Sequence, residues 1–191
     1  MNWLLFLSQL PATPSSLRVA VWRRMRAAGA LGLQNGVWVL PNKPDQQKLL
    51  QDLLTFIQSQ GANGQIFTVS LLTMAIEKDI LERFRSDRDE EYSEFCERCQ
   101  EFLGEIRKES RKKKFTFAEL EELEQDWQRL DAWLAKIQNR DFLGGKSARK
   151  AAQFLDAGRT TLEAFSAQVY SHQGLDISGD QRQKPSSRKS K

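Results

Sequence analysis

The sequence predicts a protein of the α+β class, and two patterns along the chain carry that prediction. Over about the first seventy residues, short apolar runs typical of strands alternate with segments of helical periodicity. Beyond Thr73 the pattern changes, because residues 74–103 contain neither glycine nor proline and their apolar residues recur at steps of three and four. We therefore expect a sheet-containing domain followed by long helices.

The first strand and the first helix are predicted from apolar spacing. A continuous apolar run at residues 3–7 suits a buried strand, and the prolines that follow it end the strand. Ser15 or Ser16 can cap the next helix, and Gly29 ends it. The apolar face of this helix is formed by Leu17, Val21, Met25 and Ala28.

A hairpin, a second helix and a last strand complete the first domain. Asn35-Gly36, a strong hairpin signal, separates apolar runs at residues 30–33 and 37–40. A helix is expected over residues 45–60 and a strand over residues 65–69. The resulting order, β-α-β-β-α-β, is that of a ferredoxin-like domain.

The remaining chain predicts an antiparallel bundle of long helices. The charged residues 85–91 are expected to bend or interrupt the first of these helices, and a basic loop at residues 111–114 follows it. Thr116 and Glu119 match a capping box that begins the second helix, and Ser147 is expected to cap the last one. The predicted limits are residues 1–72 for the ferredoxin-like domain, 73–173 for the helical domain and 174–191 for a disordered basic tail.

Composition and charge narrow the function. The net charge is +4, and the chain is basic over residues 1–60, acidic over residues 77–101 and basic over residues 174–191. This layout favours an anionic partner for either basic part. The alternative is that the mixed charges are only a solvated surface. The apolar start of the chain is too short to span a membrane and has no preceding positive charge. We therefore expect a cytoplasmic protein with no membrane partner. Two cysteines make no disulfide framework, which agrees with a reducing compartment.

Basic residues interleaved with tryptophan form the first candidate site. On the first helix, Arg18, Trp22 and Arg26 lie at i, i+4 and i+8, and such a stripe suits phosphate contacts and base stacking. The alternative is that Trp22 packs against a neighbouring helix and the arginines are solvated. The predicted nucleic-acid-binding residues are Arg18, Trp22, Arg23, Arg24, Arg26, Arg111, Lys112, Lys113 and Lys114.

The loop before the last helix forms the second candidate site. Residues 144–147, Gly-Gly-Lys-Ser, resemble the end of a phosphate-binding loop, but the first glycine of that motif is absent and no strand precedes it. A helix N-terminus flanked by basic residues still suits an oxyanion. The predicted oxyanion-binding residues are Arg140, Lys146 and Arg149.

No catalytic constellation, cofactor site or metal site is predicted. Cys96 and Cys99 have C-x-x-C spacing, but they lie within a predicted helix, with both thiols on its apolar face. Packing is the favoured interpretation, and a redox or metal pair is the alternative. A zinc site would need further ligands, and the chain has one histidine, His172.

Residues 3–41 resemble a known family. They read W-L-L-F-L-S-Q-L-P-x-x-P-S-x-L-R-V-x-V-W-R-R-M-R-x-x-G-A, followed by L-Q-N-G-V-W-V-L-P, and they resemble the N-terminal domain of the chromate-resistance protein ChrB. The resemblance extends to W-L-A-K-I-Q-N-R-D-F at residues 133–142 and covers the chain up to its tail. The strand and W-R-R helix are similar, more distantly, to the Cas2-like region of the phenylacetate repressor PaaX.

The resemblance implies a chromate-resistance regulator that binds DNA and responds to chromate or a related oxyanion such as sulfate. The alternative is a non-catalytic interaction or dimerisation module, and a homodimer is left open. Enzymatic alternatives are a thiol-dependent oxyanion reductase or a Cas2-like nuclease. Cas2 nucleases carry an aspartate at the end of the first strand, whereas residues 3–9 contain none, which disfavours metal-dependent cleavage.

Overall fold

The computed structural model describes residues 2–13, 15–71 and 73–174. Residues 175–191 of the predicted tail lie outside this part of the chain. In chain order the elements are β1 (Asn2–Gln9), α1 (Ser16–Ala27), β2 (Leu31–Gln34), β3 (Val37–Pro41), α2 (Pro44–Ser59), β4 (Asn63–Ser70), α3 (Met74–Arg111), α4 (Phe117–Asn139) and α5 (Lys146–His172).

The chain forms two compact units. The first contains residues 1–92 and 136–145, and the second contains residues 93–135 and 146–191. The first unit thus holds the sheet, its two helices and the first half of α3, whereas the second holds the rest of α3, most of α4 and α5. The domain limits predicted from the sequence stay predictions.

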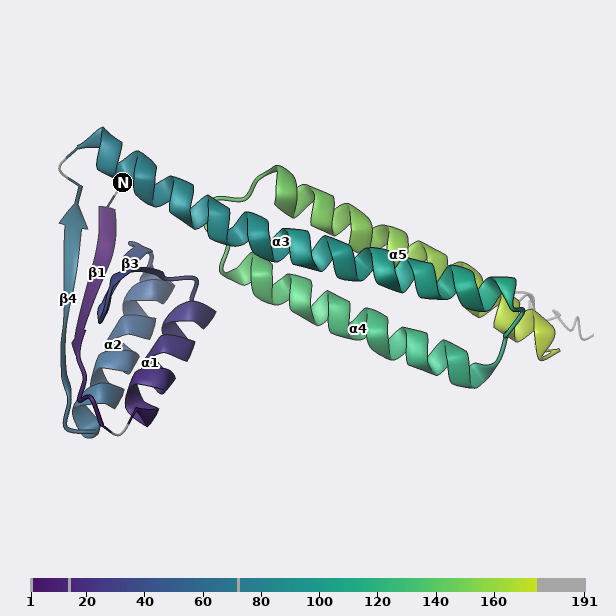
Figure 1. Cartoon of the computed structure of the whole chain (residues 1–191), viewed down its shortest axis with the longest axis horizontal. Coiled ribbons are helices and arrows are strands. Elements are labelled where there is room, and N and C mark those ends of the chain that lie inside the picture. Colours follow the sequence, from purple (N-terminus) through teal and green to yellow (C-terminus); the bar gives the residue numbers. More distant parts are fainter. Residues whose placement is uncertain (1, 14, 72, 175–191) are drawn as a thin grey trace, which may run out of the picture. The chain divides into compact units, whose positions relative to one another are not determined.

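The first unit has the predicted ferredoxin-like topology. Its four strands are ordered β2-β3-β1-β4, and each neighbouring pair is antiparallel. Helices α1 and α2 lie on the same face of this sheet (Figure 1). The α+β class and the β-α-β-β-α-β order are confirmed, because each apolar run and each helical period formed the element that its spacing predicts.

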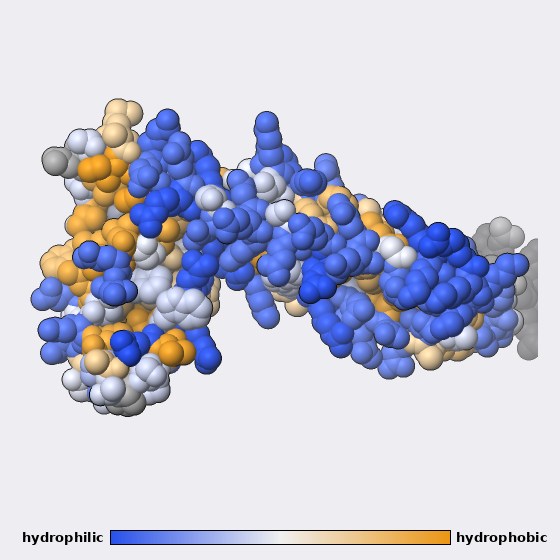
Figure 2. Space-filling model, in the orientation of Figure 1, coloured by the Kyte–Doolittle hydropathy of each residue, from blue (hydrophilic) through white to orange (hydrophobic). Residues whose placement is uncertain are grey.

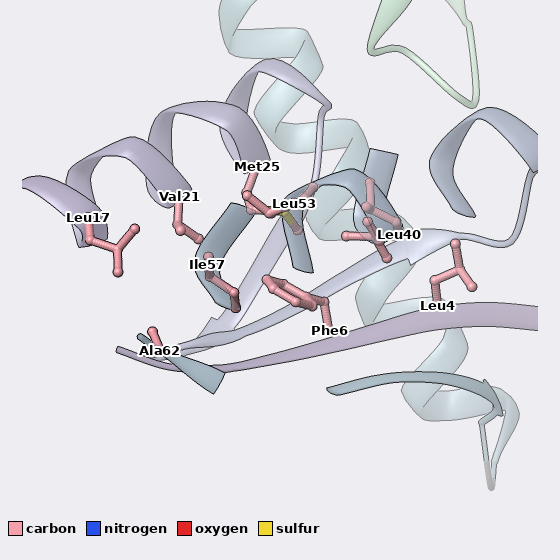
Figure 3. Close-up of a cluster of buried hydrophobic side chains, with 11 residues drawn as sticks. Leu4, Phe6, Leu17, Val21, Met25, Leu40, Leu53, Ile57 and Ala62 are labelled. Atoms are coloured by element: carbon pink, nitrogen blue, oxygen red, sulfur yellow. The ribbon is translucent and has the colours of Figure 1, made fainter. Parts of the chain in front are cut away.

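One core lies between the sheet and the two helices. Leu4 and Phe6, two residues apart on β1, lie on the same face of the sheet and belong to one cluster with Val21 and Met25 of α1 and Ile57 of α2 (Figure 3). Side chains at these five positions are at most 2% exposed. The predicted apolar face of α1 is therefore confirmed. Ser15 occupies the N-cap position of this helix, as predicted, but its side chain makes no cap hydrogen bond.

A second cluster lies on the opposite face of the sheet. Trp3 of β1 and Val39 of β3 pack with Ile80 and Phe84 from the first half of α3. The rings of Trp3 and Phe84 stack with their centroids 5.8 Å apart. This packing accounts for the inclusion of the first half of α3 in the sheet-containing unit.

The predicted bend in the first long helix is wrong. Helix α3 continues from Met74 through the charged segment 85–91 to Arg111. Within this segment, Asp87 pairs with Arg26 at 3.1 Å and Glu91 pairs with Arg140 at 2.9 Å. Because these carboxylates have partners outside α3, the like charges along the segment do not have to be separated by a break in the helix.

In the second unit, the rest of α3 and the helices α4 and α5 run side by side, each antiparallel to the one before it in the chain (Figure 1). Its apolar stripes bury Phe95, Leu134 and Phe165, as the spacing predicts, and Phe95 meets Trp133 edge to face at 5.5 Å. The capping hydroxyl of Thr116 accepts the backbone N–H of Glu119 at 3.3 Å, as predicted. The predicted Ser147 cap is wrong, because α5 begins at Lys146 and Ser147 lies in its first turn.

Candidate nucleic-acid interface

The outer face of α1 carries the arginines and the tryptophan predicted to contact nucleic acid. Trp22 is 53% exposed, so its indole does not pack into the core between the helices. Arg18 and Arg23 are also exposed. Arg23 makes no ion pair or side-chain hydrogen bond within the part of the chain that the structure describes. Its charge is therefore free for a phosphate.

The other three arginines of α1 already have intramolecular contacts. Arg18 Nη2 donates to the carbonyl oxygen of Ala12 at 2.6 Å, which orients its guanidinium against the loop before the helix. Arg24 lies 3.8 Å above the ring centroid of Phe56 as a cation–π pair. Arg26 pairs with Asp87. Arg18 keeps donors for a further acceptor, whereas the charge of Arg26 is partly neutralised.

Trp22 and Arg18 border a groove between α1 and the β2–β3 hairpin. The groove has a volume of about 580 Å³. It is lined by Ser8, Leu10, Arg18, Val21, Trp22, Gly32, Leu33, Gln34, Asn35, Gly36 and Trp38. Trp38 is directly opposite Gly32 in the β2–β3 register, and a Cβ added at Gly32 would lie 3.4 Å from its ring. The missing side chain at Gly32 therefore leaves room for the Trp38 indole.

This groove combines two indole rings, a guanidinium and the amides of Gln34 and Asn35. Such a set can stack on a flat aromatic ring, donate hydrogen bonds to a phosphate and pair with polar ring edges. Sequence reasoning identified Arg18 and Trp22 but missed Trp38. The i, i+4 spacing on α1 was visible in the sequence, whereas the hairpin comes beside α1 only in the folded sheet.

The basic loop at residues 111–114 belongs to the second unit and is organised by a buried carboxylate. Glu109 is 3% exposed, and its oxygens lie 3.1 Å from Lys112 Nζ and 3.5 Å from Lys114 Nζ. The hydrogen bond from Lys112 holds the pKa of Glu109 below its usual range, and Lys114 acts in the same direction. Lys112 and Lys114 are thus partly neutralised. Lys113 has a φ of 54°, so the chain reverses there in the left-handed region after α3.

The residues predicted to bind an oxyanion lie in different surroundings. In the first unit, Arg140 Nε donates to Glu91 Oε2 at 2.9 Å, and Arg140 Nη1 donates to the carbonyl oxygen of Lys136 at 3.1 Å. In the second unit, Lys146 and Arg149 lie exposed in the first turn of α5. The Arg140 guanidinium is thus held by an internal carboxylate.

The Arg140-Asp141-Phe142 segment fastens its loop to α3. Asp141 Oδ1 accepts the backbone N–H groups of Leu143 and Gly144, and Asp141 Oδ2 accepts the hydroxyl of Tyr92 at 3.0 Å. Burial, together with this hydrogen bond and the charge of Asp141, raises the pKa of Tyr92. Phe142 meets Phe84 edge to face at 6.0 Å. The segment is structural in the first unit.

A buried arginine, Arg88, was not predicted. It is 7% exposed, and its Nη1 lies 3.3 Å from Glu91 Oε2 without the geometry of a hydrogen bond. Burial lowers the pKa of Arg88, Glu91 opposes that shift, and the positive charges of Arg140 and Arg26 add to it. The spacing of four residues from Phe84 through Arg88 to Tyr92 places Arg88 on the apolar stripe of α3, so the helical period indicated its burial although its charge did not.

Cys96 and Cys99 are both buried free thiols in the second unit, as the packing interpretation predicts. Burial raises the pKa of Cys96 and raises the pKa of Cys99 to about 12, with Cys96 adding to the latter shift. Thiolate is the reactive form. Among the residues that the structure describes, no group of three or more potential metal ligands forms a metal site.

We expect the two thiols to be nearly unreactive in the native protein. At pH 8 a thiol of pKa about 12 is ionised in roughly one molecule in ten thousand. A colorimetric disulfide reagent should therefore label Cys96 and Cys99 slowly in buffer and fully in denaturant. Because folding raises the pKa of both thiols, the free energy of unfolding is expected to fall as the pH rises from about 9 toward 12. Fast native labelling at pH 7 would instead support a redox role.

Comparison with known proteins places the chain in a family. The family model described as "Protein ChrB, N-terminal" matches residues 18–175. Protein ChrB of Cupriavidus metallidurans is 33% identical over 93 residues, which cover 49% of this chain and 28% of that protein. The match thus spans little more than a quarter of the relative's length. No helix in the described part of the chain has the length and apolar character needed to cross a membrane. The chain belongs to the family of ChrB N-terminal domains.

Proposed function

We propose that this chain is a chromate-resistance regulator of the ChrB type that binds DNA through the outer face of α1. The observation that carries the proposal is the groove beside α1, where Arg18 and Trp22 meet Trp38. Arg23 adds an exposed positive charge on the same helix. Arginine supplies phosphate contacts, and the two indoles supply flat apolar surface for sugars or bases.

The basic residues differ in what they can contribute. On α1, Arg18 and Arg23 are the strongest phosphate contacts, because no carboxylate neutralises them and neither stacks on an aromatic ring as Arg24 does. Arg26 and Lys112 are weaker candidates, because Asp87 and Glu109 already balance them. The family resemblance supports regulation and a cytoplasmic location, and we assign no catalytic step to the chain.

Salt-dependent binding tests the proposal. Anisotropy of a labelled fragment from the promoter of the protein's own operon should show binding that weakens steeply with salt. Arg18→Ala and Arg23→Ala should each reduce the slope of log K against log salt by about 1. The matched control is Arg98→Ala, which removes an exposed arginine paired with Glu101 in the second unit. Absence of binding by the wild-type protein at low salt would overturn the proposal.

A response to oxyanions is the finer part of the proposal. Its candidate residues are Arg140 in the first unit, and separately Lys146 and Arg149 in the second. Arg140 would have to release Glu91 to bind an anion with its Nε. Calorimetric titration with chromate, with sulfate alongside, should give saturable heat that Lys146→Ala or Arg149→Ala reduces. No heat and no change in thermal midpoint with either anion would remove this part while leaving DNA binding intact.

A second candidate function is a protein-interaction module. A groove of about 470 Å³ lies between α3 and α4 in the second unit. Its apolar floor is Phe102, Leu130 and Trp133, and its rim carries arginines and carboxylates. If this function is the correct one, the anisotropy assay should show no DNA binding, and Trp133→Ala should abolish binding to a partner protein.

A further inference from the structure

The four-stranded sheet of the first unit ends in two edge strands, β2 and β4. Open strand edges present unpaired N–H and C=O groups that can pair with another chain, so native proteins usually protect them. The two edges of this sheet differ in their protection.

The β2 edge is protected in three ways. The strand has four residues, and its register with β3 shifts between Gly32 and Gln34. Arg83 Nη2 also donates to the carbonyl oxygen of Gly32 at 2.9 Å. Shortness, an irregular register and a charged side chain on a backbone acceptor are devices that discourage pairing with another strand.

The β4 edge has none of these protections. It has eight residues, all paired with β1 in a continuous register from Asn2↔Ser70 to Gln9↔Asn63. Its sequence is Asn-Gly-Gln-Ile-Phe-Thr-Val-Ser, without a charged residue or a proline. Among the residues that the structure describes, β1 is the strand that β4 pairs with, so the other edge of β4 faces no strand.

Apolar side chains adjoin this open edge on the face of the sheet away from α1 and α2. Phe67 is 44% exposed and pairs with Leu5 of β1, so the two side chains share a face. Leu5, Leu7 and Val69 are partly exposed on the same face. Apolar surface gathers over the region of β1 and β4 (Figure 2).

We propose that β4 is a homodimerisation edge, at which β4 of a second copy pairs antiparallel to it. A two-fold interface places each surface patch against its own copy, so a charged strand would meet its own charge. The uncharged β4 edge avoids that repulsion, so it can lie against the same edge of a second copy. The pairing would extend the sheet from four strands to eight.

The symmetry restricts the register. Directly opposed residues of antiparallel strands share a face, so the two-fold axis passes through a residue and not between two residues. We place it at Phe67, the most exposed large apolar side chain of the strand. Phe67 then opposes Phe67 of the second copy, and Gln65 opposes Val69 on the face that carries Leu5.

Mass measurement over a concentration series tests the edge. The wild-type chain should show twice the monomer mass by light scattering at high concentration. Thr68→Lys adds a charge at an exposed position of β4 and should raise the dimer dissociation constant at least tenfold. The matched control is Gln34→Lys on β2, which should dimerise like the wild type. Circular dichroism should show both variants folded.

Cross-linking tests the register. Phe67→Cys should give a disulfide-linked dimer under mild oxidation, because the two introduced thiols face each other across the axis. Leu33→Cys, at an exposed position on β2, should not. A wild-type chain that is monomeric at high concentration, or a Thr68→Lys variant that dimerises like the wild type, would overturn the proposal. It does not rest on DNA binding, so a monomer that binds the promoter would leave the proposed function intact.

Capture of a strand from a different protein is another outcome that would overturn the proposal. It would appear as a monomeric wild-type chain whose complex with that partner is abolished by Thr68→Lys.

Discussion

Gly29→Ala is expected to lower the free energy of unfolding by about 2–4 kcal/mol. Gly29 follows α1 with a φ of +74°, in the left-handed region that disfavours an L side chain. A Cβ there would also lie 2.6 Å from the carbonyl oxygen of Arg140 and 2.7 Å from its Cβ. Backbone strain and steric overlap therefore add, and the loop that Arg140 begins has to move. Chemical denaturation monitored by circular dichroism measures the loss.

Gly61→Ala is the matched control for this substitution. Gly61 has the same φ of +74°, but a Cβ there would meet nothing within 4 Å. The control should therefore lose about 1 kcal/mol, the conformational part alone. The difference between the two variants isolates the contact between Gly29 and Arg140. Equal losses at both positions would contradict the close approach of these two segments.

Arg88→Ala is expected to lower the free energy of unfolding by about 2–4 kcal/mol, chiefly through the space left by its long side chain. The side chain of Arg88 is 8% exposed and packs among charged neighbours. Arg88→Met should stay within about 1 kcal/mol of the wild type, because an apolar side chain of similar length refills the space without the cost of burying a charge. Thermal and urea unfolding of both variants measures the two changes in the free energy of unfolding.

The carboxylates beside Arg88 keep other partners when Arg88 is replaced. Asp87 keeps Arg26 at 3.1 Å, and Glu91 keeps Arg140 at 2.9 Å. Removing the guanidinium of Arg88 therefore leaves neither carboxylate without a partner. If Arg88→Met were as damaging as Arg88→Ala, the charge itself, and not the packed volume, would be what the fold needs. Arg98→Ala, at an exposed ion pair, should change stability by less than about 1 kcal/mol.

Local patterns predicted the framework of the fold because strand and helix periodicities are properties of neighbouring residues. The continuous apolar run at residues 3–7 predicted a buried strand, and the steps of four from Leu17 to Met25 selected one face of α1 for burial. The same logic placed Cys96 and Cys99 on a buried helical face. The Ser147 cap failed because a cap depends on where the helix begins, which these patterns locate only to within a residue or two.

The part of the candidate interface that lies on α1 was also predictable from the sequence. Arg18 and Trp22 lie one turn apart on one helix, so their shared face follows from the helical period. Trp38 joins them through the sheet, because β3 pairs with β1 and with β2 in a register that no local pattern specifies. The open edge at β4 likewise depends on the order of all four strands.

The amino-acid pattern alone was sufficient to predict the fold class, the burial of the apolar faces and the family resemblance, since all three depend on residues close together along the chain. Tertiary structure decided which charges are free. Arg26 meets Asp87 across 61 residues, and Arg140 meets Glu91 across 49. A charged side chain pairs with whichever opposite charge folding brings close to it. The distance in space between two charges is unrelated to their separation in sequence. For this reason Arg18 and Arg23 are stronger candidates for phosphate contacts than Arg26 of the same helix.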